Sequence, residues 1–178
     1  AFTSGYNGGD GVILCSNAHT AALAVAAGDP SASNLLTTSA ALSQTSLEQM
    51  LIQIRQAADP RGKKIRLVPQ QLVASPSNML QCEVLLKSVL RAGTNNNDLN
   101  PVKSMGMLSN SVILSRLTSS TAWFIQTDAS NGMQIKWRRK IEKSTEGDFE
   151  TDSVRYKSTM RFGSGWTDWR TVFGTPGT

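Results

Sequence analysis

His19 is the only histidine in this 178-residue chain, and it is the first candidate for acid–base chemistry. A serine hydrolase would place a nucleophile beside such a base, but the GxSxG pattern that presents the serine does not occur. A zinc site needs several ligands at short spacing, whereas Cys15 and Cys82 are far apart and form no CxxC pair. The sequence therefore predicts no catalytic, cofactor-binding or metal site, and His19 is expected to be a structural, hydrogen-bonding residue.

Two other motifs could bind nucleotides or bases. Residues 8–11 read Gly-Gly-Asp-Gly, but they lack the lysine of a phosphate-binding loop and the spacing of a dinucleotide fingerprint, so they predict a tight turn. Trp166 and Trp169 lie near Arg161 and Arg170 in sequence and could stack on bases or on the arginines. Packing within the fold or at a subunit contact is the more frequent use of such aromatic residues.

The two cysteines are expected to be unpaired, buried thiols, with a single disulfide as the alternative. No Asn-x-Ser/Thr acceptor, no signal peptide and no apolar run long enough to span a bilayer is visible. These features favour a protein made in a reducing cytoplasm. The first residue is Ala1 rather than Met, so the chain is expected to be a processed or truncated product.

The full chain has a net charge of +5, and its clearest charge pattern lies near the C-terminal end. Apolar and polar residues alternate over 133–141 and again over 154–162, which predicts two long, half-buried, antiparallel strands joined by a turn over 144–152. Arg139 alone interrupts the apolar face. The polar positions form basic rows, which are candidate subunit or DNA-facing contacts: Lys136, Arg138, Lys140, Arg155, Lys157 and Arg161. Like charges side by side repel, and a protein or nucleic-acid partner that neutralises them would reduce this repulsion. The alternative is that solvent and the acidic residues of the turn are sufficient to reduce it.

The middle of the chain must position these strands, and its pattern predicts a mixed α/β unit. A helix is expected from Ser46, with Ser46 and Gln49 at capping-box spacing, to Asp59-Pro60. Its apolar stripe predicts core packing and consists of Leu47, Met50, Leu51, Ile54, Ala57 and Ala58. A strand is expected over 64–68, ended by Pro69, and further short strands over 111–114 and 123–125.

A second helix is expected to begin at Ser77 or Asn78 and to end at a Gly93 cap. Its predicted buried side is Met79, Cys82, Leu86, Val89 and Leu90. A loop follows over 94–101. Before these elements, residues 1–45 are expected to form an irregular segment in which Ala-rich residues 21–27 make at most a helical turn.

Several segments, in order, resemble the major capsid proteins of tailed bacteriophages, especially the Mu-like major head subunit group. The resemblance is carried by Gly11–Leu14 with His19, by Asn34-Leu35 before the Ser46 helix, by Gly62–Pro69 with Leu72-Val73, by Gly93 with the Asn95–Asn100 loop, by Ala122–Ile125, and by Val154–Phe162 with Gly165-Trp166 and Gly174. Each motif is common alone, and their order over nearly the whole chain carries the resemblance.

The resemblance implies an α+β protein with the Hong Kong 97-type capsid fold. Residues 1–45 would be an irregular N-terminal segment after a missing spine helix, 46–132 an axial-domain-like unit, and 133–178 long antiparallel strands returning to the peripheral domain. The implied function is structural: self-assembly into the icosahedral head shell that encloses phage DNA in the virion, after synthesis in the bacterial host cytoplasm. The implied partners are other copies in pentamers and hexamers, portal, scaffolding or cement proteins, and packaged DNA bound without sequence preference, with no membrane and no cofactor.

The chain departs from the family in one respect. Members usually carry an N-terminal arm, an extended β-hairpin loop and a long spine helix before this region, and none of these is expected here. Elements that lock neighbouring subunits together would then be missing. The alternative function, from another class, is a monomeric basic nucleic-acid-binding module that uses the rows over 136–161.

Overall fold

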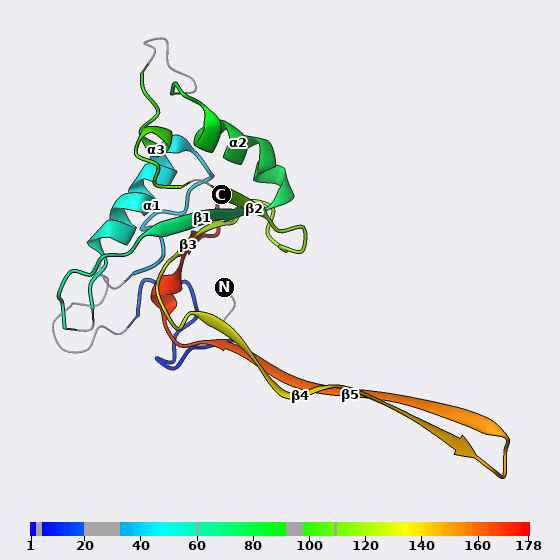
Figure 1. Ribbon diagram of the computed structural model, residues 1–178. Helices are drawn as coiled ribbons and strands as arrows, with labels where there is room; N and C mark the ends of the chain where they lie inside the picture. The colour runs from blue at the N-terminus through cyan, green and yellow to red at the C-terminus, as the bar shows by residue number, and fades with distance from the viewer. Residues whose placement is uncertain (3–4, 20–32, 60, 92–97, 109) are drawn as a thin grey trace.

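A computed structural model describes residues 1–2, 5–19, 33–59, 61–91, 98–108 and 110–178 (Figure 1). It contains a four-stranded sheet with strand order β2-β1-β3-β6 and a separate two-stranded sheet, β4-β5. The strands are β1 Pro69–Ala74, β2 Asn110–Ile113, β3 Trp123–Thr127, β4 Met133–Asp148, β5 Ser153–Trp166 and β6 Val172–Thr175. The helices are α1 Gln44–Gln56, α2 Met79–Lys87, α3 Pro101–Ser104 and the short 3-10 helices η2 Pro76–Asn78 and η3 Trp169–Thr171. Within these residues, no helix has the length and apolar character that crossing a membrane requires.

Helix α1 begins two residues before the predicted Ser46, because its N-cap is Ser43. The Ser43 hydroxyl accepts from the backbone N–H of Ser46 at 3.2 Å, and the Ser46 hydroxyl accepts from the Ser43 N–H at 2.9 Å. This is a capping box in which a serine takes the place of the usual Glu or Gln. The predicted pairing of Ser46 with Gln49 is therefore wrong, whereas the predicted apolar stripe is confirmed, since every member of it is buried.

The strand predicted over 64–68 is displaced along the chain. Lys64 makes only an isolated bridge with Ala58, and residues 65–68 run as irregular backbone toward β1. Pro69 opens β1 instead of ending a strand, because the first strand position is one where a missing N–H is tolerated. The strands expected over 111–114 and 123–125 are confirmed as β2 and β3 to within one or two residues at their ends.

The two faces of the four-stranded sheet are covered by different segments. Strand β1 is parallel to β2 and antiparallel to β3, and β3 is antiparallel to β6. The register aligns Leu72, Ile125 and Phe173 on the face that packs against α1 and α2 in the main core. Phe124 points to the opposite face, where Leu14 and Cys15 of the N-terminal segment join it in a second cluster. The C-terminal strand β6 is thus an integral part of the central sheet.

Helix α2 buries less of its surface than its sequence predicts. Cys82, Leu85 and Leu86 are buried, but Met79 is half exposed. Val89 and Leu90 are exposed too, because the helix ends at Lys87 and the extended backbone of Ser88 turns the chain away. The predicted Gly93 cap, the start of the 94–101 loop and the helical turn at 21–27 lie outside the described residues.

Strands β4 and β5 form a long antiparallel hairpin that projects away from the rest of the molecule (Figure 1). The prediction of two long antiparallel strands is confirmed, although the turn between them is shorter than expected, at 149–152. The prediction that they are half-buried is wrong: the large apolar side chains of the two strands, from Met133 to Phe162 and apart from the turn, are between 51% and 81% exposed. An extended hairpin is therefore present in this chain, but it lies between β3 and β6 of the central sheet and not before the central unit.

Candidate functional site

The strand pairing divides the hairpin into two chemically distinct faces. Directly opposed residues of an antiparallel pair project to the same side, so the register assigns each side chain to a face. One face carries seven apolar side chains, Met133, Ile135 and Trp137 of β4 and Val154, Tyr156, Met160 and Phe162 of β5, and the register also places Lys143, opposite Ser158, on this apolar face. The charged face consists of Lys136, Arg139, Glu142, Glu146 and Asp148 of β4 and Arg155, Lys157 and Arg161 of β5.

The apolar face is held in shape by contacts across the two strands. Trp137 lies opposite Phe162, and their ring centroids are 5.3 Å apart at an interplanar angle of 50°. Such a tilted aromatic pair stabilises the hairpin beyond the area that it buries. Both rings nevertheless remain about half exposed, so the face offers apolar surface to a partner.

Two β-bulges interrupt β4 and explain why its simple alternation misleads. Trp137 faces Phe162 and Arg139 faces Arg161, which leaves Arg138 as an extra residue, and a second extra residue falls between Arg139 and Glu142. The first bulge moves Arg139 onto the charged face, opposite Arg161. The interruption of the apolar face that the sequence predicts at Arg139 is therefore wrong. Strand β5 carries no bulge.

All six predicted contact residues are exposed on the hairpin. The structure brings four of them together on the charged face, namely Lys136, Arg155, Lys157 and Arg161, and it places Arg138 and Lys140 within the bulged stretch of β4. Sequence alternation missed Arg139, which completes the basic cluster near the root, and Glu146, which lies opposite Arg155. Arg139 and Arg161 are directly opposed like charges, and the Glu142 carboxylate, 3.7 Å from the Arg139 guanidinium, offsets part of their repulsion.

The hairpin tip is a structured turn. The Asp148 carboxylate accepts from the Glu150 N–H at 3.2 Å and from the Thr151 hydroxyl at 2.9 Å, and it lies 3.8 Å from the Arg155 guanidinium. Asp152 has a φ of 52°, a left-handed conformation that aspartate tolerates better than most residues. These contacts hold the turn while the side chain of Phe149 stays in solvent, with 101% exposure.

The root of the hairpin is fixed by close backbone contacts. Asn131 adopts a φ of 60°, and its carbonyl accepts from the N–H groups of Thr167 and Asp168 at 3.3 and 3.0 Å. Gly132 lies so close to Thr171 that a Cβ there would be 2.2 Å from the Thr171 hydroxyl oxygen. A side chain at position 132 would therefore push the hairpin away from η3.

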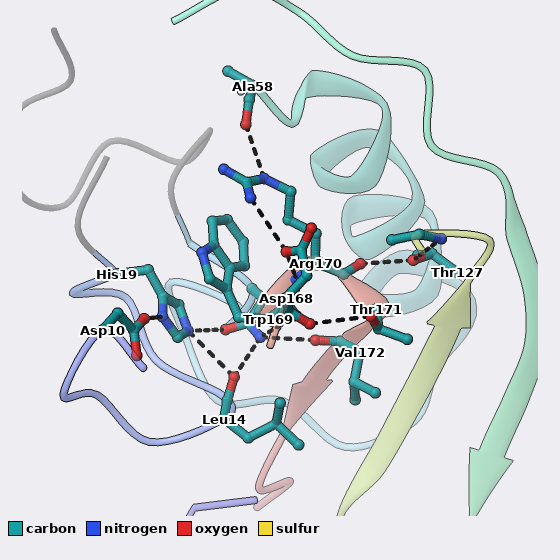
Figure 2. A network of polar contacts seen from close by, with 12 residues as sticks. Asp10, Leu14, His19, Ala58, Thr127, Asp168, Trp169, Arg170, Thr171 and Val172 are labelled. Atoms are coloured by element: carbon teal, nitrogen blue, oxygen red, sulfur yellow. Dashed lines mark hydrogen bonds and ion pairs between the residues drawn. The ribbon is translucent and has the colours of Figure 1, made fainter. Parts of the chain in front are cut away.

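A buried polar network anchors this root to the central sheet (Figure 2). Its centre is Asn34, which is fully buried. The Asn34 side-chain NH₂ donates to the carbonyls of Leu14, Trp169 and Val172 at 2.6, 3.1 and 2.7 Å, so its two hydrogens are shared among three acceptors. Its carbonyl oxygen accepts from the Ser16 N–H at 2.8 Å. One side chain thus ties the N-terminal segment to η3 and β6.

His19 belongs to the same network as a structural residue. Its Nδ1 lies 2.7 Å from the Asp10 carboxylate, and its Nε2 lies 3.2 Å from the Leu14 carbonyl and 3.1 Å from Asn34 Oδ1. All three neighbours offer acceptor oxygens, and which ring nitrogen donates depends on the tautomer. The ring is also stacked on Trp169 at a centroid distance of 4.5 Å. A ring with both nitrogens engaged and one face covered suits the predicted hydrogen-bonding role.

Arg170 extends the network toward α1. Its Nε donates to the Ala58 carbonyl at 3.0 Å, its Nη1 lies 3.2 Å from the Asp168 carboxylate, and its guanidinium lies 4.5 Å from the centroid of the Trp169 ring (Figure 2). The Thr127 hydroxyl donates to the Arg170 carbonyl at 2.6 Å. Trp169 and Arg170 therefore pack with each other within the fold, which is the use that their sequence favours.

Other predicted features of chemical interest are structural as well. Residues 8–11 form the predicted tight turn, in which the Gly11 N–H donates to the Gly8 carbonyl at 3.1 Å and Gly11 has a φ of 76°. Cys15 and Cys82 are free and buried, as predicted, and burial raises their pKa to about 12 and about 11. The described residues contain no cluster of His, Cys, Asp and Glu that could hold a metal ion.

Comparisons with known proteins place these features in a family. No curated protein matches the chain. A crystal structure of a virus-like particle from Pyrococcus furiosus is similar at a TM-score of 0.44 and 10% sequence identity, over 79% of this chain and 55% of that one. The present chain thus spans about half the length of that protein. The sequence model of the phage capsid protein family matches residues 12–174, nearly the whole chain, and the chain therefore belongs to the phage capsid protein family.

Proposed function

We propose that this chain is a shell-forming subunit whose copies join into pentamers and hexamers and close into the icosahedral head that encloses phage DNA. Membership of the capsid family makes it a structural component of the virion capsid and not an enzyme. The observation that carries the proposal is the projecting hairpin with its exposed apolar face.

The hairpin has the physical character of an arm that requires a partner. A two-stranded ribbon is marginally stable in water unless a third strand or a packed face supports it. Here a single face carries seven large apolar side chains, among them Trp137, Tyr156 and Phe162, and each is more than half exposed. A neighbouring copy that covers this face would bury the apolar surface and stabilise the ribbon at once.

The rest of the chain fits a Hong Kong 97-type arrangement as follows. Residues 46–132 would form the axial-domain-like unit, whose exposed Leu80 and Val84 on α2 are available for contacts around a ring. Residues 133–178 would lead into the peripheral part through the hairpin, while β6 returns to the central sheet. Contacts of this kind are heterologous, since different surfaces of each copy meet, and they form closed rings when the rotation between copies permits.

The basic side chains of the hairpin would serve subunit contacts or the surface that faces DNA. Lys136, Arg155, Lys157 and Arg161 share one face with Arg139, so this face presents more positive than negative charge to a partner. Phosphate groups or acidic side chains of a neighbour would neutralise it. Because the rows lie on an exposed ribbon and not on a helix shaped to the major groove, any DNA contact would be independent of sequence.

Electron microscopy of the expressed chain tests the proposal, with closed shells as the expected result. The decisive variant replaces residues 137–162 with Asn-Gly, a two-residue turn that joins the paired Lys136 and Gly163. It should remain folded, because the deleted residues lie outside the core clusters, but it should form no shells. Shells of unchanged size and yield from this variant would overturn the role assigned to the hairpin.

A further inference from the structure

Phe149 stands out among the exposed apolar residues, because it is fully exposed at the tip of the hairpin. The turn around it is held by Asp148, so the phenyl ring is presented on a defined support. An aromatic ring in that position contributes nothing to the packing of its own chain. Aromatic side chains are also the residues that most often anchor protein interfaces.

A groove that could accept such a ring lies between α1 and α3. Its volume is about 500 Å³, and its apolar lining is formed by Leu51, Ile52, Val102, Met105 and Met107. Ile52 and Met105 are 56% and 64% exposed, so the groove is open at the surface. Methionine side chains adapt readily to the shape of an inserted aromatic ring.

Charges at the tip and at the groove are complementary. Glu48 and Arg55 border the groove, but Glu48 already accepts from Gln44 at 2.9 Å and lies 3.9 Å from Arg91. Within the described part of the chain, the Arg55 guanidinium has no ion-pair partner, and neither has the carboxylate of Glu150, which follows Phe149. Docking of the tip in the groove would supply each with the other.

The hairpin tip and the α1–α3 groove lie at opposite ends of the molecule (Figure 1). The hairpin points away from α1 and α3, so a chain cannot fill its own groove with its own tip. A second copy can do so, and it then leaves its own groove free for a third. This polarity is what a repeating heterologous contact needs.

We propose that the hairpin tip of one copy inserts Phe149 into the α1–α3 groove of a neighbouring copy, with Glu150 facing Arg55. The inference rests on the proposed function, and it names the surface on which the hairpin arm docks. Each copy would thus give one ring and receive one.

The first experiment measures the subunit concentration at which particles form, by light scattering and electron microscopy. Phe149→Ala should raise that concentration by about tenfold or more, whereas Phe149→Leu, which keeps an apolar group, should raise it less. The thermal unfolding of unassembled chains should be the same for both variants, because the ring is fully exposed. Unchanged assembly of Phe149→Ala would overturn the inference. If the hairpin deletion still abolished shells, the proposed function would nevertheless stand.

The second experiment locates the contact. Copies with Phe149→Cys mixed with copies with Ile52→Cys should form an intermolecular disulfide under oxidation, while Thr145→Cys, an exposed position further back on β4, should not cross-link to Ile52→Cys. The native Cys15 and Cys82 are buried and should stay unreactive. Arg55→Glu and Glu150→Arg should each weaken assembly, and the two together in one chain should restore it. Equal cross-linking from Thr145→Cys, or no restoration by the double change, would place the tip elsewhere.

Discussion

Replacing Asn34 with alanine should destabilise the folded chain more than the same change at Asn100 or Asn78. The three asparagines form a graded series, because they differ in the number of buried groups that they satisfy. Asn34 donates to three carbonyls and accepts from the Ser16 N–H. Asn100 donates to two carbonyls and accepts from the Val102 N–H, and Asn78 makes one contact of 3.5 Å.

The magnitudes follow from what each change leaves without a partner. A buried donor or acceptor that loses its partner costs about 1–3 kcal/mol. Asn34→Ala leaves the Ser16 N–H and at least one carbonyl in that state, so the free energy of unfolding should fall by about 3–5 kcal/mol. Asn100→Ala removes the cap of α3 and one buried pair, for about 2 kcal/mol. Asn78→Ala should cost less than about 0.5 kcal/mol, because its single contact is long.

Urea unfolding of chains held below the assembly concentration measures these free energies, provided that the slope with denaturant is unchanged. Hydrogen exchange adds the location: Asn34→Ala should accelerate exchange in η3 and β6, which the side chain holds, and not in the hairpin ladder. A cost for Asn34→Ala no larger than that for Asn78→Ala would refute the view that this network anchors the hairpin root.

Three further outcomes are expected. Ile54→Ala, at a fully buried site, should lower the free energy of unfolding by about 2–5 kcal/mol. Ile52→Ala, on the exposed side of the same helix, should lower it by less than about 0.5 kcal/mol. Equal losses in urea unfolding would contradict the packing of α1. Burial raises the pKa of Cys15 to about 12, so the contribution of this thiol to stability should be constant below about pH 9 and should decrease by about 1.4 kcal/mol per pH unit between about pH 9 and 12. Cys15→Ser should remove that part of the slope in a pH titration of unfolding. The chain should bind random DNA with a dissociation constant of about 10⁻⁴–10⁻⁶ M near physiological salt, and the affinity, measured by fluorescence anisotropy, should fall as the salt concentration rises. A thousandfold preference for one DNA sequence would favour the monomeric nucleic-acid-binding module instead.

The sequence alone determined the features that depend on local periodicity. The spacing of the apolar residues from Leu47 to Ile54 predicts an amphipathic helix, because a 3.6-residue repeat places all of them on one side. The alternation over 133–141 and 154–162 likewise predicted two antiparallel strands.

Boundaries needed more than periodicity. The cap at Ser43 and the start of β1 at Pro69 depend on which backbone groups find partners, and for β1 those partners lie in β3, more than fifty residues away. The second bulge of the hairpin is equally invisible in sequence, although it decides, with the first, which charges share a face.

The exposure of the hairpin was decided only by the tertiary structure. Alternation reports that one face of a ribbon is apolar, but it does not report what covers that face. In most proteins the cover is the same chain, and that assumption predicted a half-buried sheet. Here the network around Asn34 and the close approach of Gly132 to Thr171 direct the ribbon away from the core, and its apolar face is left for a partner.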